Sequence, residues 1–359
     1  MKNRYIKIAA VTVAFVLCCV GCVALLAGKP MAFADELAAT ESGKLNYSDG
    51  SKYEGSIENG MTRNGTGTFT WSTGESYEGT WVNDVQNGTG KMMWPGLGVY
   101  EGEFVNGKRQ GHGVFTWTYE GEPAAGKPVS FDGEWADDHI GSTGKITFAN
   151  LGIYEGEFSG GIRAGKGTFT WDNGDQYYGV WANDHIGGEG ILTLMDGTTV
   201  LEGQFANNLL TKGTVTYAVE GGTATRNVVN GKTQAGVTIV YQDDTKVVGT
   251  LKGKEFSGNV TVNYASGDTY VGTLSKGLKS GKGTYTWKSG AHYVGAWAND
   301  KMSGTGKYYY YKDESTCYLS GTFKDGLPSG TLVYVSEKKL QYNTVWSDGK
   351  CTSIKYKGK

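Results

Sequence analysis

The stretch YEGTWVNDVQNGTGKMMWPGLGVY, residues 77–100, contains the pattern that decides the fold. In its first five residues, YEGTW, the two rings and the glycine fall on one face of a strand and the polar residues on the other, because side chains alternate along a strand. Asn83 and Asp84 follow, and both residue types tolerate the positive φ of a tight hairpin turn. Alternation then resumes through Trp94. We therefore predict one antiparallel β-hairpin.

The same anchor returns along the chain. Successive anchors lie 23 or 24 residues apart, except for steps of 31 and 26 residues where insertions occur. Copies at Ala224, Val247 and Tyr342 have lost signature residues but keep the register. A fixed period of this length is typical of a repeat architecture. The thirteen anchors begin at Tyr53, Tyr77, Tyr100, Phe131, Tyr154, Tyr177, Leu201, Ala224, Val247, Tyr270, Tyr293, Leu319 and Tyr342.

Composition agrees with a folded array. The 359 residues include 58 glycines, only 5 prolines and 45 aromatic residues (23 Tyr, 12 Phe and 10 Trp). Glycine without a Gly-X-Y period excludes collagen, and this aromatic content excludes a disordered tract. Because a single sheet has no second layer, the rings must pack on one another, and glycines on the same face leave them room. We expect Gly90→Val to expel a ring and to destabilise its repeat.

The repeated units resemble the MORN (membrane occupation and recognition nexus) repeat, with "YEGTWVNDVQNGTGKMMWPGLGVY" from Tyr77 and "YVGAWANDKMSGTGKYYYY" from Tyr293 matching its consensus almost position for position. The resemblance implies an all-β fold, an elongated, twisted, single-layer antiparallel sheet of stacked hairpins. It also implies scaffolding, dimerisation and attachment near membranes.

The first 34 residues differ from the rest. Lys2, Arg4 and Lys7 precede an uncharged run at 8–28, and a small-x-small site ends at Ala34. These are the parts of a secretory signal peptide, but the run is also long enough for a membrane-spanning helix with the repeats outside. We therefore expect a secreted protein cleaved after Ala34, or a single-pass cell-membrane protein with one N-terminal hydrophobic helix. The predicted order is 1–34 signal or anchor, 35–44 linker, 45–350 repeat array and 351–359 basic tail.

Residues that could carry chemistry do not converge. His139 and His185 occupy the same turn offset in two repeats, and the glutamates of the YEG anchors recur once per repeat on the outward face. Glycine-rich strings lack the helix and the lysine of a phosphate loop. Cys317 and Cys351 should lie at opposite ends of their strands, too far apart for a disulfide. We expect no enzyme, no cofactor, no metal and no catalytic residue.

Binding is the expected role. The first hypothesis is a scaffold or self-association module at the cell envelope; the alternative is recognition of lipid or glycan by stacked rings. The aromatic candidates for a binding face are Tyr77, Trp81, Trp94, Tyr154, Trp171, Tyr177, Trp181, Tyr270, Trp287, Tyr293 and Trp297.

Charge is uneven along the chain, whose formal net charge is −2. Residues 35–203 contain 10 basic and 25 acidic residues, net −15, whereas residues 204–359 contain 20 basic and 11 acidic residues, net +9. One interpretation is that the charge varies among repeats without a function, because all their outer faces are solvated. The functional interpretation is contact between the basic half and an anionic lipid, a wall polymer or the acidic half of another copy. Nucleic acid is not expected to be a partner.

Overall fold

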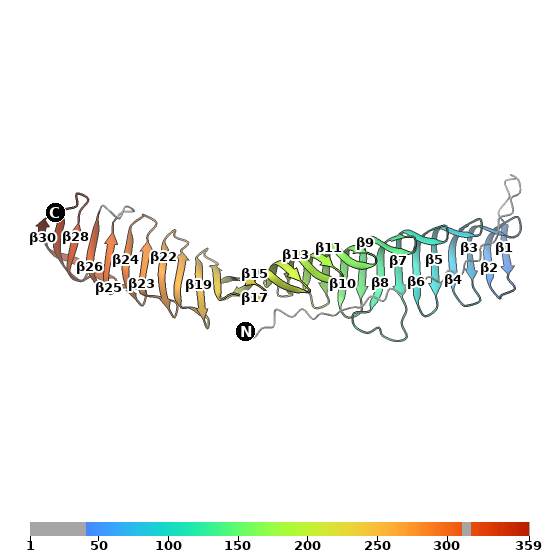
Figure 1. The fold of residues 1–359 in the computed structure, drawn as a ribbon, viewed down its shortest axis with the longest axis horizontal. Coiled ribbons are helices and arrows are strands. Elements are labelled where there is room, and N and C mark those ends of the chain that lie inside the picture. Colours follow the sequence, from blue (N-terminus) through green and yellow to red (C-terminus); the bar gives the residue numbers. More distant parts are fainter. Residues whose placement is uncertain (1–40, 311–316, 359) are drawn as a thin grey trace. The chain divides into compact units, whose positions relative to one another are not determined.

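The fold is all-β. The computed structural model describes residues 41–310 and 317–358, which form thirty β-strands in one antiparallel sheet and no helix (Figure 1). This confirms, for the described residues, the predicted all-β fold with a single antiparallel sheet. The predicted signal or anchor at 1–34 lies outside them.

The chain divides into two units. Unit 1 contains the described residues up to Gly197 together with Glu202–Leu210, and unit 2 contains Thr198–Leu201 and the described residues from Thr211 onward. The strands wholly in unit 1 are β1 (Glu41–Asn46), β2 (Lys52–Glu58), β3 (Thr62–Thr70), β4 (Ser76–Val82), β5 (Val85–Trp94), β6 (Gly98–Val105), β7 (Lys108–Trp117), β8 (Pro128–Ala136), β9 (His139–Phe148), β10 (Gly152–Ser159), β11 (Ile162–Trp171), β12 (Gln176–Ala182) and β13 (His185–Thr193).

Two strands take residues from both units, β14 (Val200–Ala206) and β15 (Leu209–Val219). The strands of unit 2 are β16 (Gly222–Val229), β17 (Lys232–Thr233), β18 (Gly236–Tyr241), β19 (Lys246–Lys252), β20 (Glu255–Phe256), β21 (Gly258–Asn263), β22 (Thr269–Ser275), β23 (Leu278–Thr286), β24 (His292–Ala298), β25 (Lys301–Tyr309), β26 (Tyr318–Lys324), β27 (Leu327–Pro328), β28 (Gly330–Val335), β29 (Gln341–Ser347) and β30 (Lys350–Gly358).

Each repeat is a hairpin, as predicted. In the repeat that begins at Tyr77, β4 pairs with β5 so that Tyr77 lies opposite Met92 and Gly79 opposite Gly90. The turn residues Asn83 and Asp84 have φ of 49° and 70°. These are left-handed values, in which Asn and Asp are less strained than most residues. A β-bulge between Gly79 and Trp81 recurs at the same place in other hairpins.

The tyrosine of each intact anchor lies flat over a glycine. A Cβ added to Gly90 would lie 2.4 Å from Cε2 of the Tyr77 ring, closer than carbon atoms can approach. The hydroxyl of Tyr77 donates a hydrogen bond to the carbonyl of Thr80 at 3.1 Å, and the side chain is fully buried. The prediction that glycines make room for rings is confirmed. The same arrangement occurs at Tyr53, Tyr100, Tyr154, Tyr177, Tyr270 and Tyr293.

We call the side of the sheet that bears these rings the ring face, and the opposite side the outer face. On the ring face, Trp81 makes edge contacts with Tyr53 and Tyr77, with ring centroids 5.7 and 5.1 Å apart. Such edge-to-face pairs are favourable beyond the area they bury. The rings therefore form the core of unit 1 without a second layer. In unit 2 the core continues with aliphatic residues such as Val247 and Leu319 at anchor positions.

Neighbouring repeats are also joined at their turns. The backbone N–H of Asp84 donates to the carbonyl of Arg63, and the N–H of Gly107 donates to the carbonyl of Gln86. Equivalent bonds join later turns, for example from Asp300 to Lys279. Most hairpins are thus tied to the preceding one by a bond additional to those between paired strands.

The repeats that have lost signature residues, which we call worn copies, still form paired strands of the sheet. Ala224 is buried in β16, which pairs with β15 and β18, and Tyr342 lies in β29, which pairs with β28 and β30. Tyr342 is only half-buried. The sheet also includes residues outside the range 45–350, because β1 begins at Glu41 and β30 extends to Gly358.

Candidate interaction surfaces

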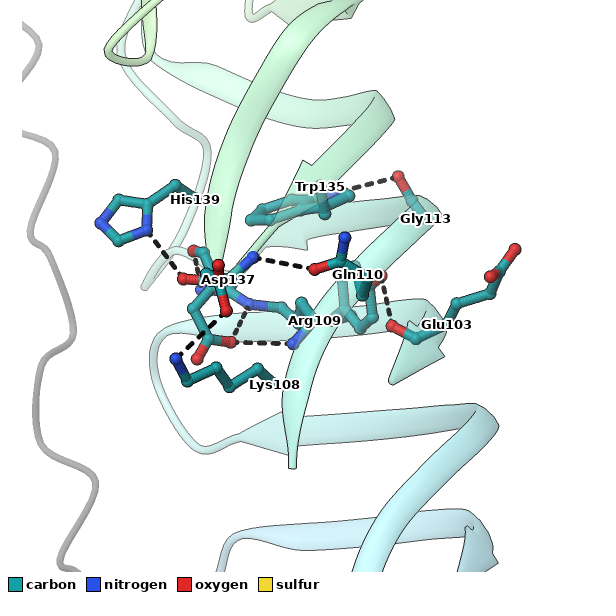
Figure 2. Close-up of polar contacts among 10 residues, drawn as sticks. Glu103, Lys108, Arg109, Gln110, Gly113, Trp135, Asp137 and His139 are labelled. Atoms are coloured by element: carbon teal, nitrogen blue, oxygen red, sulfur yellow. Dashed lines mark hydrogen bonds and ion pairs between the residues drawn. The ribbon is translucent and has the colours of Figure 1, made fainter. Parts of the chain in front are cut away.

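A cation held against a tryptophan recurs on the ring face. The guanidinium carbon of Arg109 lies 4.3 Å from the centroid of the Trp135 ring. The Arg109 backbone N–H and Nε donate to Oδ1 of Asp138 at 3.0 and 3.1 Å, and its Nη2 donates to the Asp138 carbonyl at 2.7 Å. Nε1 of Trp135 donates to the carbonyl of Gly113 at 3.0 Å. Figure 2 shows these contacts around Arg109.

This cation–Trp–Asp clamp occurs four times among the residues that the structure describes. Each copy joins the strand after one turn to the turn of the next hairpin, so it spans two repeats. The sequence signal is an alternation between Gly and Asp at the second turn position, as in Asn59-Gly60 and Asn83-Asp84. We did not predict the clamp from that signal. The four sets are Arg63, Trp81 and Asp84; Arg109, Trp135 and Asp138; Arg163, Trp181 and Asp184; and Lys279, Trp297 and Asp300.

Burial and pairing act in opposite directions on the pKa of two of these cations, Arg109 and Arg163. Desolvation lowers the pKa of Arg109, while the hydrogen bond and charge of Asp138 act to raise it. The pKa of Arg163 is lowered by the same cause and opposed by Asp184. Guanidinium groups remain protonated because their ordinary pKa is far above neutrality. Arg109 and Arg163 are therefore charged, paired and mostly buried.

The structure places the predicted binding-face residues in two groups. Three of the tryptophans are half-buried, and each lies near the end of the second strand of its hairpin. They are Trp94, Trp171 and Trp287. Their binding role stays a prediction. The other eight are buried in contacts with this chain, so their rings are not open to a partner, namely Tyr77, Trp81, Tyr154, Tyr177, Trp181, Tyr270, Tyr293 and Trp297.

Two further tryptophans belong with the half-buried group. Trp71 directly follows β3 and Trp117 ends β7, and both are half-buried. Trp71 packs on Phe69 with ring centroids 4.6 Å apart, and Trp117 packs on Phe115 at 4.8 Å. A row of partly accessible indoles thus follows the ends of second strands in unit 1.

The outer face carries solvated charges, as predicted for the anchor glutamates. Lys44 Nζ lies 2.9 Å from Glu54 Oε1, and Lys91 Nζ lies 2.7 Å from Glu101 Oε1. All four side chains are more than half exposed. Surface ion pairs of this kind contribute little to stability. Their value lies in the charge that they present to solvent.

The histidines have separate surroundings. Nδ1 of His139 lies 2.7 Å from the carbonyl of Asp137, and Nδ1 of His185 lies 2.6 Å from that of Asn183. These matching contacts confirm that both are copies of one turn position. His112 pairs with Asp132 at 2.9 Å, and His292 stacks on Tyr309. Residues 41–310 and 317–358 contain no group of three or more His, Cys, Asp or Glu that could hold a metal ion.

The two cysteines of the repeat region lie far apart in the register. Cys317 is buried just before β26 and donates a weak hydrogen bond to the hydroxyl of Tyr334 at 3.2 Å. Cys351 is exposed in β30, opposite Trp346 and next to the last hairpin turn. Both thiols are free.

No helix that could cross a membrane is present among the described residues. The predicted anchor at 1–34 is outside that set.

Comparison with protein families identifies the repeats. The sequence model of the MORN repeat matches seven segments, at residues 53–76, 77–98, 100–118, 154–176, 177–199, 270–292 and 293–313. The chain is a MORN-repeat protein. The stretches between and after these MORN matches contain the worn anchors at Ala224, Val247 and Tyr342, yet they form paired strands. The sheet therefore tolerates loss of the MORN signature.

Other comparisons add little to the MORN assignment. No curated protein matches the chain. One solved structure is similar to it, the TCP10 domain of Danio rerio CPAP in complex with a peptide of Danio rerio STIL, at 12% identity over 71% of this chain and 93% of that one, with a TM-score of 0.25. Another is the extracellular domain of the putative one component system BT4673 from B. thetaiotaomicron, at 9% identity over 88% and 66%, with a TM-score of 0.13.

Proposed function

We propose that this MORN-repeat protein is a non-catalytic scaffold at the cell envelope, which binds a protein or another copy of itself. The repeats support a role in protein or membrane interaction, because MORN repeats often mediate such contacts. The composition of residues 1–34 supports export, either with cleavage after Ala34 or with a retained anchor.

The observation that carries the proposal is the difference between the two faces: the ring face is buried in packing contacts, and the outer face is exposed and charged. On the ring face, tyrosines such as Tyr100 are fully buried, and cations such as Arg109 are held by a carboxylate and a tryptophan. These groups serve the packing of the sheet. The outer face presents a long polar surface with exposed carboxylates and lysines. A surface of this kind suits a polar protein contact better than a pocket for chemistry.

The test is to find where the protein resides and what lies beside it. Intact mass of the protein from its native cells decides whether Ala34 is the last residue removed. A membrane-impermeant, lysine-reactive crosslinker on whole cells should then join lysines of the repeats to one protein species or to a second copy. Failure to label the repeats in intact cells, with labelling after lysis, would contradict export. Export without any protein crosslink would contradict scaffolding.

The half-buried tryptophans favour a second candidate, recognition of lipid or glycan. Trp94 and Trp171 leave part of an indole accessible, and aromatic rings suit both stacking and amphipathic contact. Basic charge in residues 204–359 suits an anionic lipid or wall polymer. Under this alternative, Trp171→Ala abolishes retention on lipid or glycan arrays, whereas under the scaffold proposal it leaves protein crosslinks unchanged.

A further inference from the structure

Carboxylates are concentrated on the outer face of unit 1. Three successive first strands, β6, β8 and β10, each carry two outward acidic residues separated by one glycine. All six side chains are exposed, while the rings on either side of them in the sequence are buried on the ring face. The six are Glu101 and Glu103, Asp132 and Glu134, and Glu155 and Glu157.

Four of these six carboxylates, including Glu155, form no ion pair within the described chain. Glu101 pairs with Lys91, and Asp132 pairs with His112. Across the described residues, no ion pair involves Glu103, Glu134 or Glu157. Their strands alternate with intervening second strands, so the three carboxylates repeat about every 9.6 Å, which is twice the inter-strand distance.

The outer face of unit 2 has the opposite character. At the position after the anchor, where unit 1 has Glu101, Asp132 and Glu155, unit 2 has valines that are 40–54% exposed, namely Val248, Val271 and Val294. Among the strands described from β18 to β30, only the two-residue β20 contains a carboxylate, Glu255.

Lysines supply the charge on this surface. Lys246 and Lys324 occupy outward positions of β19 and β26, and both are exposed. Lys282 pairs across the sheet with Ala296, and Lys307 pairs with Val294. Among the described residues, none of these four lysines forms an ion pair. On the outer face, unit 1 thus bears these six carboxylates and unit 2 bears these four lysines.

We propose that the lysine-bearing outer face of unit 2 docks on the carboxylate-bearing outer face of unit 1 of a second copy of this chain. Both faces are built from the same repeat, so their strands have the same spacing. The exposed valines of unit 2 lie on the same face as the lysines, and contact with a second copy would remove them from water. This inference rests on the proposed scaffold function and names the partner as the chain itself.

A membrane fits these observations less well. An anionic lipid surface would attract the lysines but would not explain why unpaired carboxylates recur on alternate strands of the other unit. Charge complementarity between two faces of one chain accounts for both sets at once. Adsorption to lipid is therefore an outcome that the experiment must distinguish.

The test uses the full chain in a non-ionic detergent solution, with mass measured by sedimentation at low and high NaCl. Two triple variants reverse one face each, the acid-face variant E103K/E134K/E157K and the base-face variant K246E/K282E/K324E. We expect the wild type to associate at low salt, and each variant alone to associate at least tenfold more weakly. An equimolar mixture of the two variants should associate again, because one now carries lysines and the other glutamates on both faces.

The control and the contrary outcomes are specific. K254E/K288E/K338E changes net charge equally but at exposed turn or loop positions, and it should associate like the wild type. A monomeric wild type at low salt, equal weakening by the control, or no recovery on mixing would each overturn the inference. Monomeric chain that sediments with anionic vesicles, but not after K246E/K282E/K324E, would assign the basic face to lipid. The cell-surface crosslinking above still succeeds if the scaffold binds a different protein, so the two proposals fail separately.

Discussion

Arg109 lies over the face of Trp135, with its guanidinium carbon 4.3 Å from the ring centroid, although the two residues belong to neighbouring hairpins. Asp138, at the turn of the second hairpin, holds the same guanidinium from its edge. Because repeats of an array contact only their neighbours, contacts of this kind set how cooperatively the sheet unfolds. The clamp is thus an inter-repeat joint built from a cation, a ring and a carboxylate.

Replacing the clamp cation should loosen this joint. Arg109→Met removes the guanidinium from the Asp138 carboxylate, which is only 32% exposed, and removes the cation–π contact, so we expect a local loss of about 2–4 kcal/mol. Arg109→Lys should lose about half as much stability, because lysine keeps the positive charge but lacks the planar guanidinium group. Hydrogen exchange of the Asp138 N–H, which donates to the Arg109 carbonyl, reports the opening.

The neighbouring lysine is the matched control. Lys108 pairs with Asp137 at 3.2 Å, but both side chains are more than half exposed. Lys108→Met should therefore cost less than about 1 kcal/mol. If K108M and R109M increase exchange equally, the clamp contributes no more than an ordinary surface ion pair.

A side chain at Gly90 should destabilise its repeat. A Cβ there would meet the Tyr77 ring at 2.4 Å, so Gly90→Val must displace the ring, at a cost of about 3 kcal/mol or more. Gly236→Ala is the control, because nothing lies within 4 Å of its added Cβ and its φ is not positive. Limited proteolysis should cleave the 77–94 hairpin much faster in G90V, whereas G236A should match the wild type. Unchanged cleavage of G90V would refute the packing of ring on glycine.

Alkaline pH should unfold the ring face. Burial raises the pKa of Tyr77, Tyr100, Tyr177, Tyr270 and Tyr293 from 10.0 to about 12. A folded pKa above the unfolded one favours the folded state fully below pH 10, and this stability is lost as pH rises from 10 toward 12. The free energy of unfolding should therefore fall steeply across that window. Ionisation of these phenols near pH 10 with the sheet still folded would show that they are accessible.

Thiol labelling tests the position of the two cysteines. Cys351 is exposed and Cys317 is buried, so a maleimide should label Cys351 within the mixing time and Cys317 only upon local opening. Peptide mapping assigns each label. Comparable rates at the two sites, or a Cys317–Cys351 disulfide, would mean that the register around β26 to β30 is wrong.

Most of the fold was predictable because a single rule recurs. The YEGTW pattern with its turn residues gives a hairpin, and its return every 23 or 24 residues gives the array. Even the copy at Ala224 could be placed by register alone, and it lies in β16 as a paired strand. A period identifies a position in a repeat whether or not the residue there has changed.

Accessibility was harder to predict. The rings of Tyr77 and Trp81 were candidates for a binding face because stacked aromatic rings suit lipid or glycan recognition. In the structure, mutual edge contacts and packing on glycines bury both rings. The clamp escaped notice because Arg63 and Asp84 are 21 residues apart and belong to different repeats. Net charge per half of the chain likewise did not show that Glu101 and Glu103 share one face.

The central claim is that partners meet the outer face and that the ring face belongs to the fold. Footprinting of the full chain under associating and dissociating conditions tests it most directly, with carbodiimide labelling for carboxylates and radical oxidation for indoles. We predict that association protects Glu103, Glu134 and Glu157, while oxidation of Trp94, Trp171 and Trp287 is unchanged. Protection of these tryptophans, with the three glutamates labelled as before, would contradict the account and make the ring face the binding surface.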